Sequence, residues 1–438
     1  MSARRVAQSR EVLRSAVSAA PPPVPDPPGS ESGRVSAFAF PHYRRLWIGA
    51  FLSSLGTWTQ DVALSWLIHT RFADPSLLGV RAFAADAPLL AFMLVGGAMA
   101  DRVDRRRILL ASQTLQLLFA ATLGVLFAFD RLGIGGILLI AFLTGLAQSQ
   151  SAPTYQTVIT SLVPRAVIPS AVALNSLQFN LSRAIGPVIA GLLLARAGTG
   201  ACFALNAVSF VAVILALLGL HLPPPARASQ QGLGASMREG VFHVGRSPVL
   251  RVLTLTGAAA SFLAFPLVTY LPVVAGEVLR TGASGYSLLL TSFGVGAIVG
   301  ALATAHRGHV PGRDRTLLRH LVLFGAATIA AMASGRQDLA MGMLVVSGWS
   351  IVSAFSILNS LVQENAPDAL RGRVVSIYGL AFRGGMPLGS LSAGFLVRGF
   401  GAPGVIGAYC LVLVALAALL RFRGPRFGLA LTPDEMRT

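Results

Sequence analysis

The stretch that decides the fold is a charged turn, Gly97-Ala98-Met99-Ala100-Asp101-Arg102-Val103-Asp104-Arg105-Arg106-Arg107. It joins two apolar runs, each long enough to cross a bilayer as a helix. Gly97 lacks a side chain, so we expect another helix to approach closely there. Asp101 follows the first run directly, where it could meet the positive N-terminal end of a neighbouring helix. The arginines could equally serve only to anchor the turn at the membrane surface.

Apolar runs of this length recur along all 438 residues. The chain is 54% hydrophobic and 12% charged, whereas soluble domains usually carry about 25% charged residues. We therefore predict an all-α membrane protein with twelve transmembrane helices in two six-helix pseudo-repeats. The predicted spans are 46–68, 78–99, 108–129, 134–154, 168–195, 201–220, 250–275, 286–306, 317–334, 338–361, 372–398 and 403–421.

The longest interruption, residues 221–249, divides the predicted spans into two halves, 45–220 and 250–421. We expect it to be a cytoplasmic loop, with a short amphipathic helix from Met237 to Pro248. Residues 1–44 are predicted to be a disordered cytoplasmic tail and residues 422–438 a cytoplasmic C-terminal tail. An internal repeat supports the division, because residues 203 positions apart match: Gly97 with Gly300, Pro164 with Pro367, and Gly186 with Gly389.

The formal net charge of +18 comes from arginines, and most of them fall in the tails and in the loops on one side of the predicted spans. That asymmetry places both termini in the cytoplasm. It does not indicate nucleic-acid binding, since no basic module interleaved with aromatic residues is present. Cys202 and Cys410 both lie inside apolar runs, which argues against a disulfide or a zinc site. We expect no cofactor, no metal and no enzymatic activity, because no nucleophile–base pair or phosphate-binding loop is found.

The charged turn resembles the signature between spans 2 and 3 of the major facilitator superfamily, Gly-x-x-x-Asp-Arg-x-Gly-Arg-Arg. Asp104 replaces the second glycine of that pattern. This variant is similar to the branch that includes the enterobactin exporter and macrolide-efflux-type permeases. Further stretches match the same branch: Tyr43-Arg44-Arg45-Leu46-Trp47, Ser54-x-Gly56-Thr57-Trp58, Ala173-Leu174-Asn175, Arg183-x-x-Gly186-Pro187 and Leu370-Arg371-Gly372-Arg373-Val374. The resemblance covers residues 40–420.

The resemblance implies the major facilitator fold, alternating access and a place in the bacterial inner membrane. In that superfamily the signature braces the two halves against each other on the cytoplasmic side. The implied gating residues are Gly97, Asp101, Arg102, Arg105 and Arg106. The equivalent turn of the second half has Thr304 in place of the acid, which predicts a brace on one side only.

Ionisable residues inside spans are costly, so they are usually functional or paired. Asp61 shares one helix face with Ser54, Thr57 and Ser65, and we expect that face to look into the bundle. Asp86 lies near mid-depth of the second span, with Arg81 one turn plus one residue away. We predict Asp61, Asp86, Arg183 and Arg383 as proton-coupling or substrate residues, with Asp61 ranked ahead of Asp86. Each of them could instead make a structural contact, and Arg183 in particular could be the fixed partner of a carboxylate.

The predicted function is that of a secondary active transporter. The branch favours a monomeric, proton-driven exporter of an amphipathic small molecule, such as a drug, an antibiotic or a siderophore. A buried carboxylate could couple proton entry to export by gaining and losing a proton as the site changes sides. Two alternatives remain open: an uptake symporter with the same fold, and a membrane sensor that does not transport.

Overall fold

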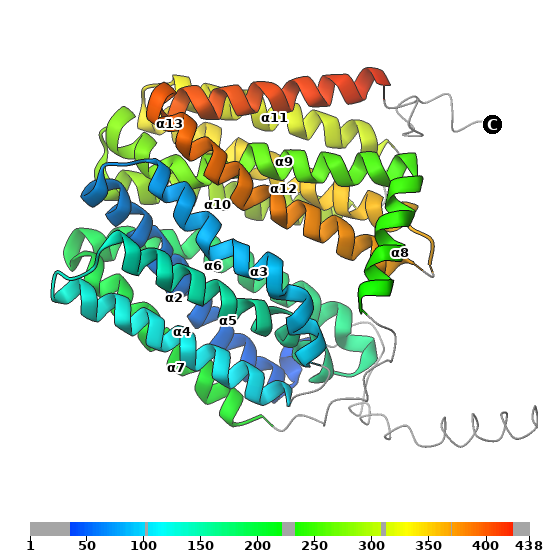
Figure 1. Ribbon diagram of the computed structural model, residues 1–438, viewed down its shortest axis with the longest axis horizontal. Helices are drawn as coiled ribbons and strands as arrows, with labels where there is room; N and C mark the ends of the chain where they lie inside the picture. Colours follow the sequence, from blue (N-terminus) through cyan, green and yellow to red (C-terminus); the bar gives the residue numbers. More distant parts are fainter. Residues whose placement is uncertain (1–35, 101–103, 221–232, 308–311, 369, 424–438) are drawn as a thin grey trace, which may run out of the picture.

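The computed structural model describes residues 36–100, 104–220, 233–307, 312–368 and 370–423, and within them the chain forms a bundle of long helices (Figure 1). Helical segments keep every backbone hydrogen bond within the segment, which is what a lipid environment requires. The N-terminal half consists of α2 (Pro41–Phe72), α3 (Ser76–Ala100), α4 (Arg105–Ala128), α5 (Ile134–Ser161), α6 (Ile168–Arg196) and α7 (Gly198–Leu218), with short 3₁₀ turns at Ala37–Ala39 and Arg165–Val167.

The C-terminal half has the same number of spans. It consists of α9 (Pro248–Val273) with a π-helical turn at Val274–Val278, α10 (Gly282–Arg307), α11 (Arg313–Ala333), α12 (Gln337–Asn365) and α13 (Arg371–Arg423). Gly401 has a φ of 71° and divides α13 into two spans. Within the described residues, nine helices are long and apolar enough to cross a membrane, with α13 counted once. The second span of α13 and the two helices α2 and α3 complete the predicted twelve.

The first span starts earlier than the sequence predicts. The helix α2 begins at Pro41, inside the segment predicted to be a disordered tail. The Tyr43 hydroxyl donates a hydrogen bond to the Ala171 carbonyl (2.8 Å), and the Trp47 indole donates one to the Leu174 carbonyl (2.9 Å). Both carbonyls belong to the first turns of α6, so this segment is fixed by contacts that hydropathy does not reveal.

The predicted amphipathic helix between the halves is confirmed as α8, although its bounds are Leu233–Arg246. Figure 1 shows α8 running across the ends of the bundle helices rather than along them. Its Glu239 carboxylate forms an ion pair with Arg373 of α13. A Cβ at Gly240 would lie 3.3 Å from Cβ of Arg373, so α8 packs closely on the C-terminal half.

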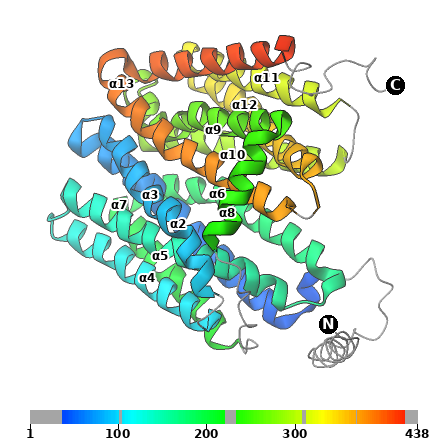
Figure 2. The ribbon, with the colours of Figure 1, turned by 45° about the vertical axis from the view of Figure 1, so that its right-hand side comes forward.

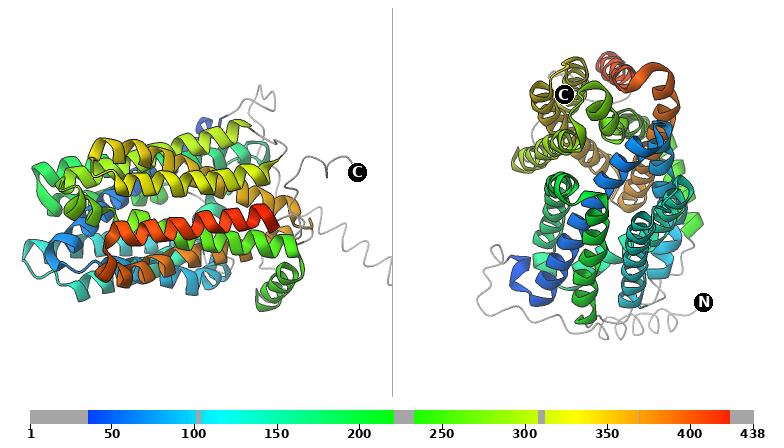
Figure 3. Two further views of the ribbon diagram at one scale, coloured as in Figure 1. Left: turned by 90° about the horizontal axis from the view of Figure 1, so that it is seen from above. Right: turned by 90° about the vertical axis from the view of Figure 1, so that its left-hand side faces the viewer.

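The predicted repeat is visible in how each half is packed. A Cβ added at Gly186 of α6 would overlap Cβ of Trp58 in α2. At the equivalent Gly389 of α13, it would overlap the Phe262 carbonyl oxygen in α9. Glycine thus permits the same close helix approach at the same place in both halves. The two six-helix groups lie beside each other in the end-on view (Figure 3).

The helix α2 begins and α13 ends on one side of the bundle, which we call the termini side (Figure 2). The opposite side is the far side. Two close approaches between the halves lie toward the far side. A Cβ at Gly191 of α6 would lie 2.7 Å from Cβ of Ser287 in α10. A Cβ at Gly394 of α13 would lie 3.0 Å from Cα of Ser76 in α3.

Candidate transport site

The predicted site residue Asp61 forms an ion pair with Arg81 within the N-terminal half. Nη1 of Arg81 in α3 lies 2.5 Å from Oδ1 of Asp61 in α2. Nη2 of the same arginine donates to Oγ of Ser65 (3.3 Å), one turn beyond Asp61. The Arg81 side chain is 13% exposed and that of Asp61 is 44% exposed, so the arginine is the buried partner.

The polar face predicted for α2 points into the bundle, as expected. Its residue Ser54 accepts a hydrogen bond from the Gln178 amide of α6 (2.7 Å). Thr57 lies 3.4 Å from the Asn206 side-chain oxygen of α7. The face therefore meets α6 and α7 near its start and α3 near Asp61.

Asp86 lies on α3, five residues beyond Arg81, and it is half-buried. Its carboxylate is within electrostatic range of Arg81, Asp61 and Arg383, but it forms no hydrogen bond or ion pair with any residue that the structure describes. The sequence offered Arg81 as a neighbour of Asp86. In the structure, this arginine forms its ion pair with Asp61 instead.

An aromatic residue of the C-terminal half lies near the ion pair of Asp61 and Arg81. Tyr286 of α10 is buried, and its ring stacks on Trp66 of α2 with a centroid distance of 6.2 Å. The Tyr286 hydroxyl is within electrostatic range of both Asp61 and Arg81. Residues of both halves therefore surround the ion pair.

Arg183 of α6 is held by aromatic rings. Its guanidinium carbon lies 5.8 Å from the centroid of Trp58 in α2 and 5.2 Å from that of Phe293 in α10. Its Nε is buried and has no hydrogen-bond partner among the described residues. The hypothesis of a carboxylate partner is wrong for the described part of the chain, because the side chain meets two ring faces instead.

Arg383 of α13 is exposed and faces Asp86 at electrostatic range rather than in direct contact. Gly384 and Gly385 beside it lie within a continuous helix, because α13 continues unbroken to Gly401. A Cβ at Gly385 would overlap Oγ of Ser261 in α9. That glycine therefore serves close packing between α9 and α13.

The charged turn is only partly visible. Asp101 and Arg102 lie outside the described residues, as do the surroundings of Gly97. Arg106 donates to the carbonyl oxygens of Leu217 (3.0 Å) and Leu218 (2.5 Å), the last residues of α7. This arginine thus binds the negative end of a helix in its own half, and not the other half as the brace would require. Nε of Arg105 is buried without a hydrogen-bond partner among the described residues.

The departure from the superfamily pattern at Asp104 has a local explanation. Asp104 is the N-cap of α4, and its Oδ1 accepts a hydrogen bond from the Arg106 backbone N–H (2.8 Å). A carboxylate at this position satisfies an otherwise unpaired N–H and faces the positive end of the helix. Aspartate therefore fixes the start of α4, from which Arg106 reaches α7.

Replacing Asp104 by alanine should lower the midpoint of thermal unfolding, because the loss of an N-cap costs about 1 kcal/mol. Asp104→Gly should cost only a few tenths of a kcal/mol, since glycine is itself tolerated at N-caps. Thermal unfolding of both variants in detergent measures the difference. Equal midpoints for Asp104→Ala and the parent protein would contradict the capping role.

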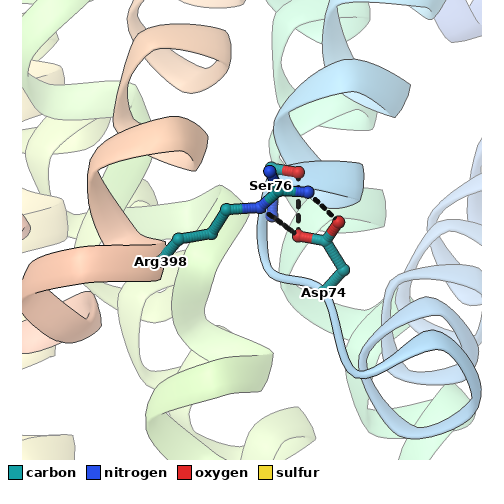
Figure 4. A network of polar contacts seen from close by, with 3 residues as sticks. All are labelled: Asp74, Ser76 and Arg398. Carbon is teal, nitrogen blue, oxygen red and sulfur yellow. Dashed lines mark hydrogen bonds and ion pairs between the residues drawn. The ribbon is translucent and has the colours of Figure 1, made fainter.

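Another ion pair, between Asp74 and Arg398, lies at the far side and joins the two halves. Asp74, in the turn between α2 and α3, accepts from Nε of Arg398 in α13 (2.8 Å) and also pairs with its Nη2. The same carboxylate accepts from the backbone N–H (3.0 Å) and hydroxyl (2.8 Å) of Ser76, at the start of α3 (Figure 4). Nothing in the sequence singles out either residue, because Asp74 resembles an ordinary outer-loop acid.

The hydrogen bond from Arg398, assisted by those from Ser76, lowers the pKa of Asp74 from 3.8 to about 2. A lowered pKa means that the carboxylate stabilises the folded state above pH 3.8, and that this contribution is lost as the pH falls through about 2. The pair thus persists at every physiological pH. Its partial exposure to solvent keeps its contribution small.

Comparison with known proteins agrees with this architecture. Residues 32–436 match the family model of the transmembrane secretion effectors, MFS_3. The chain belongs to this family. It is 27% identical to the multidrug efflux pump Tap of Mycolicibacterium fortuitum (85% of this chain, 93% of Tap) and 25% identical to the staphyloferrin A transporter of Staphylococcus aureus (83% and 93%). It is 26% identical to the enterobactin exporter EntS of Shigella boydii (87% and 94%).

Solved structures share the fold. A single-residue mutant of the nucleoside transporter NupG superimposes with a TM-score of 0.70 at 11% identity, covering 88% of this chain and 99% of NupG. A bacterial homologue of the lysosomal transporter Spinster, in an inward-facing and unoccupied conformation, gives 0.67 at 15% identity, covering 89% and 97%. The chain therefore has the major facilitator fold and is a multi-pass membrane transporter, not an enzyme.

Proposed function

We propose that this family member is a monomeric, proton-driven exporter of an amphipathic small molecule, such as a drug, an antibiotic or a siderophore. The observation that carries the proposal is the arrangement of Asp61, Arg81 and Asp86 in the N-terminal half, with Arg383 and Tyr286 of the C-terminal half within electrostatic range. Relatives named as a multidrug efflux pump and an enterobactin exporter support the outward direction.

We also propose that the termini side faces the cytoplasm of a bacterial inner membrane. The arginine asymmetry of the sequence supports this orientation. Asp74 with Arg398 and Gly191 with Ser287 join the halves toward the far side, and Ala184 with Gly294 joins them nearer the middle of the helices. In this orientation the conformation is inward-facing, ready to accept substrate from the cytoplasm.

Asp86 is our proposed proton carrier. Asp61 is occupied by Arg81 at 2.5 Å, and a carboxylate held by a guanidinium keeps its charge. Asp86 has no direct partner among the described residues, so it can accept and release a proton without breaking an ion pair. This reverses the ranking from the sequence, where Asp61 stood first because of its polar face. Asp61 and Arg81 then position α2 against α3.

Replacing Asp86 by asparagine should abolish pH-driven transport but keep substrate exchange, because exchange needs the conformational change and not a proton. The assay uses proteoliposomes that are acidic inside and have the termini side outward. Accumulation of fluorescein or rhodamine 123 is measured after lysis at a fixed pH. Asp130→Asn is the matched control, because it changes an exposed carboxylate in the turn between α4 and α5.

The same assay separates the alternatives. An uptake symporter would move the dye outward with the protons, so these vesicles would lose dye instead of accumulating it. A non-transporting sensor would show neither accumulation nor exchange. Full pH-driven accumulation by Asp61→Asn, by Asp86→Asn and by the double variant would exclude both carboxylates as the coupling site.

A further inference from the structure

Arg183 is a half-buried cation inside a span, and its partners carry no opposite charge. Among the described residues, its guanidinium meets the faces of Trp58 and Phe293, and its Nε forms no hydrogen bond. It lies in the interior of α6, far from both ends of that helix. A charge at this depth usually pairs with an acid or marks a substrate or ion pathway.

The two rings offset only part of the cost of burial. A cation–π contact stabilises a cation, but it satisfies none of the five N–H donors of a guanidinium. The buried Nε–H has no acceptor among the described residues, and an anion that accepts from it and from a neighbouring N–H would remove that penalty. An anionic group that accepts from these donors would therefore be stabilised beside Arg183.

The charge balance of the spans also favours an anion. Five of the ionisable residues inside the predicted spans are Arg81, Arg183, Arg383, Asp61 and Asp86, and among these five the arginines exceed the aspartates by one. Asp61 pairs with Arg81, which leaves Arg383 as the other arginine within electrostatic range of Asp86. Protonation of Asp86 during the cycle would make the surplus of positive charge larger still.

The position of the arginine links it to both halves. Trp58 and Arg183 belong to the N-terminal half, and Phe293 belongs to α10 of the C-terminal half. Directly beside it, a Cβ at Gly294 would lie 2.9 Å from Cα of Ala184, so α6 and α10 are in close contact here. Arg183 therefore lies where the two halves meet.

From these observations we propose that Arg183 binds the carboxylate of an amphipathic anionic substrate, with the rings of Trp58 and Phe293 contacting its apolar part. The inference rests on the proposed function in one respect only, that a small molecule enters between the halves. It narrows the substrate class from amphipathic molecules in general to amphipathic anions.

Two dyes with the same xanthene ring system test this at equilibrium, without a pH gradient. Fluorescein carries a carboxylate and is anionic, whereas rhodamine 123 is a cationic ester. Binding to the purified full-length protein in nanodiscs is measured by fluorescence anisotropy at fixed pH. The parent protein should bind fluorescein more tightly than rhodamine 123.

Arg183→Gln should weaken fluorescein binding by about ten- to hundredfold, the loss expected for a hydrogen-bonded charge pair. Its affinity for rhodamine 123 should stay within about threefold of the parent value, since the rings remain. Arg183→Lys should recover part of the fluorescein affinity. Arg131→Gln removes an arginine from the turn between α4 and α5, and it should leave the affinity for both dyes unchanged.

The proposal is overturned if the parent protein prefers rhodamine 123, if it binds neither dye, or if Arg183→Gln keeps full affinity for fluorescein. The preference of the parent protein remains a test even where a variant fails to fold. Selective fluorescein binding without pH-driven accumulation would contradict the proton-driven exporter and leave the anion site standing. pH-driven accumulation of rhodamine 123 alone would support the proton-driven exporter and contradict the anion site.

Discussion

A short cross-link between positions 74 and 398 should reduce transport to background, and cleaving that cross-link should restore it. Alternating access requires the halves to separate on the far side during each cycle. Asp74 and Arg398 hold them together there in the observed conformation, with Ser76 orienting the carboxylate (Figure 4). A covalent bridge in place of this ion pair would fix the protein in that conformation.

The experiment starts from a protein in which Cys202 and Cys410, both buried, are replaced by alanine. Asp74→Cys and Arg398→Cys are introduced together and joined with a short, reducible bifunctional thiol reagent. The matched control joins Arg71→Cys and Asp130→Cys, an ion pair (2.9 Å) on the same side but within one half. The control should retain transport after the same treatment.

Transport that persists in the cross-linked Asp74→Cys/Arg398→Cys protein would mean that the halves do not separate at this point. Each single cysteine variant, treated with the same reagent, shows whether modification alone affects transport. Because the ion pair is partly exposed, its removal by Asp74→Asn should have a much smaller effect than the cross-link.

The architecture could be predicted from the sequence because a lipid bilayer requires long apolar segments that form helices. Long apolar runs, one long interruption and a repeat at a fixed offset predicted two six-helix halves, and the helices confirm them. The glycine pair Gly186 and Gly389 shows why the repeat could be detected at all. Each permits the same close approach of two helices, so neither position can carry a side chain.

The pairing of charges could not be predicted in the same way. Spacing along one helix places Arg81 near Asp86, but the position of α2 against α3 gives the arginine to Asp61. Likewise, no local pattern connects Asp74 with Arg398, which are 324 residues apart in the sequence. Contacts between helices depend on the axial position and rotation of each helix, and single-helix periodicity does not determine these.

The motif around Asp101 illustrates a different limit. Its resemblance predicted a brace between the halves, yet Arg106, one of the described arginines of the motif, binds the end of α7. A motif that acts in one state of a transport cycle need not show its contact in another state. The sequence identifies such residues without indicating in which conformation they meet their partners.

Replacing Arg81 by glutamine should abolish transport and also destabilise the protein. The substitution leaves the Asp61 carboxylate without its partner and removes the hydrogen bond to Ser65. Breaking a fully buried pair costs ~3–5 kcal/mol, but the Asp61 side chain is 44% exposed, so we expect about 1–3 kcal/mol here. The midpoint of thermal unfolding in detergent and pH-driven dye accumulation measure the two effects. Arg71→Gln, whose partner Asp130 is 86% exposed, should change neither appreciably.

The double variant Arg81→Gln/Asp61→Asn separates stability from function. It removes both charges, so it should recover much of the lost stability, because no unpaired carboxylate remains at that position. Transport should stay low, since Asp86 would then lack the neighbouring charges within whose electrostatic range it lies. Recovery of transport together with stability would show that Asp61 and Arg81 serve only to join α2 to α3. Loss of transport at parental stability would place the pair in the coupling mechanism itself.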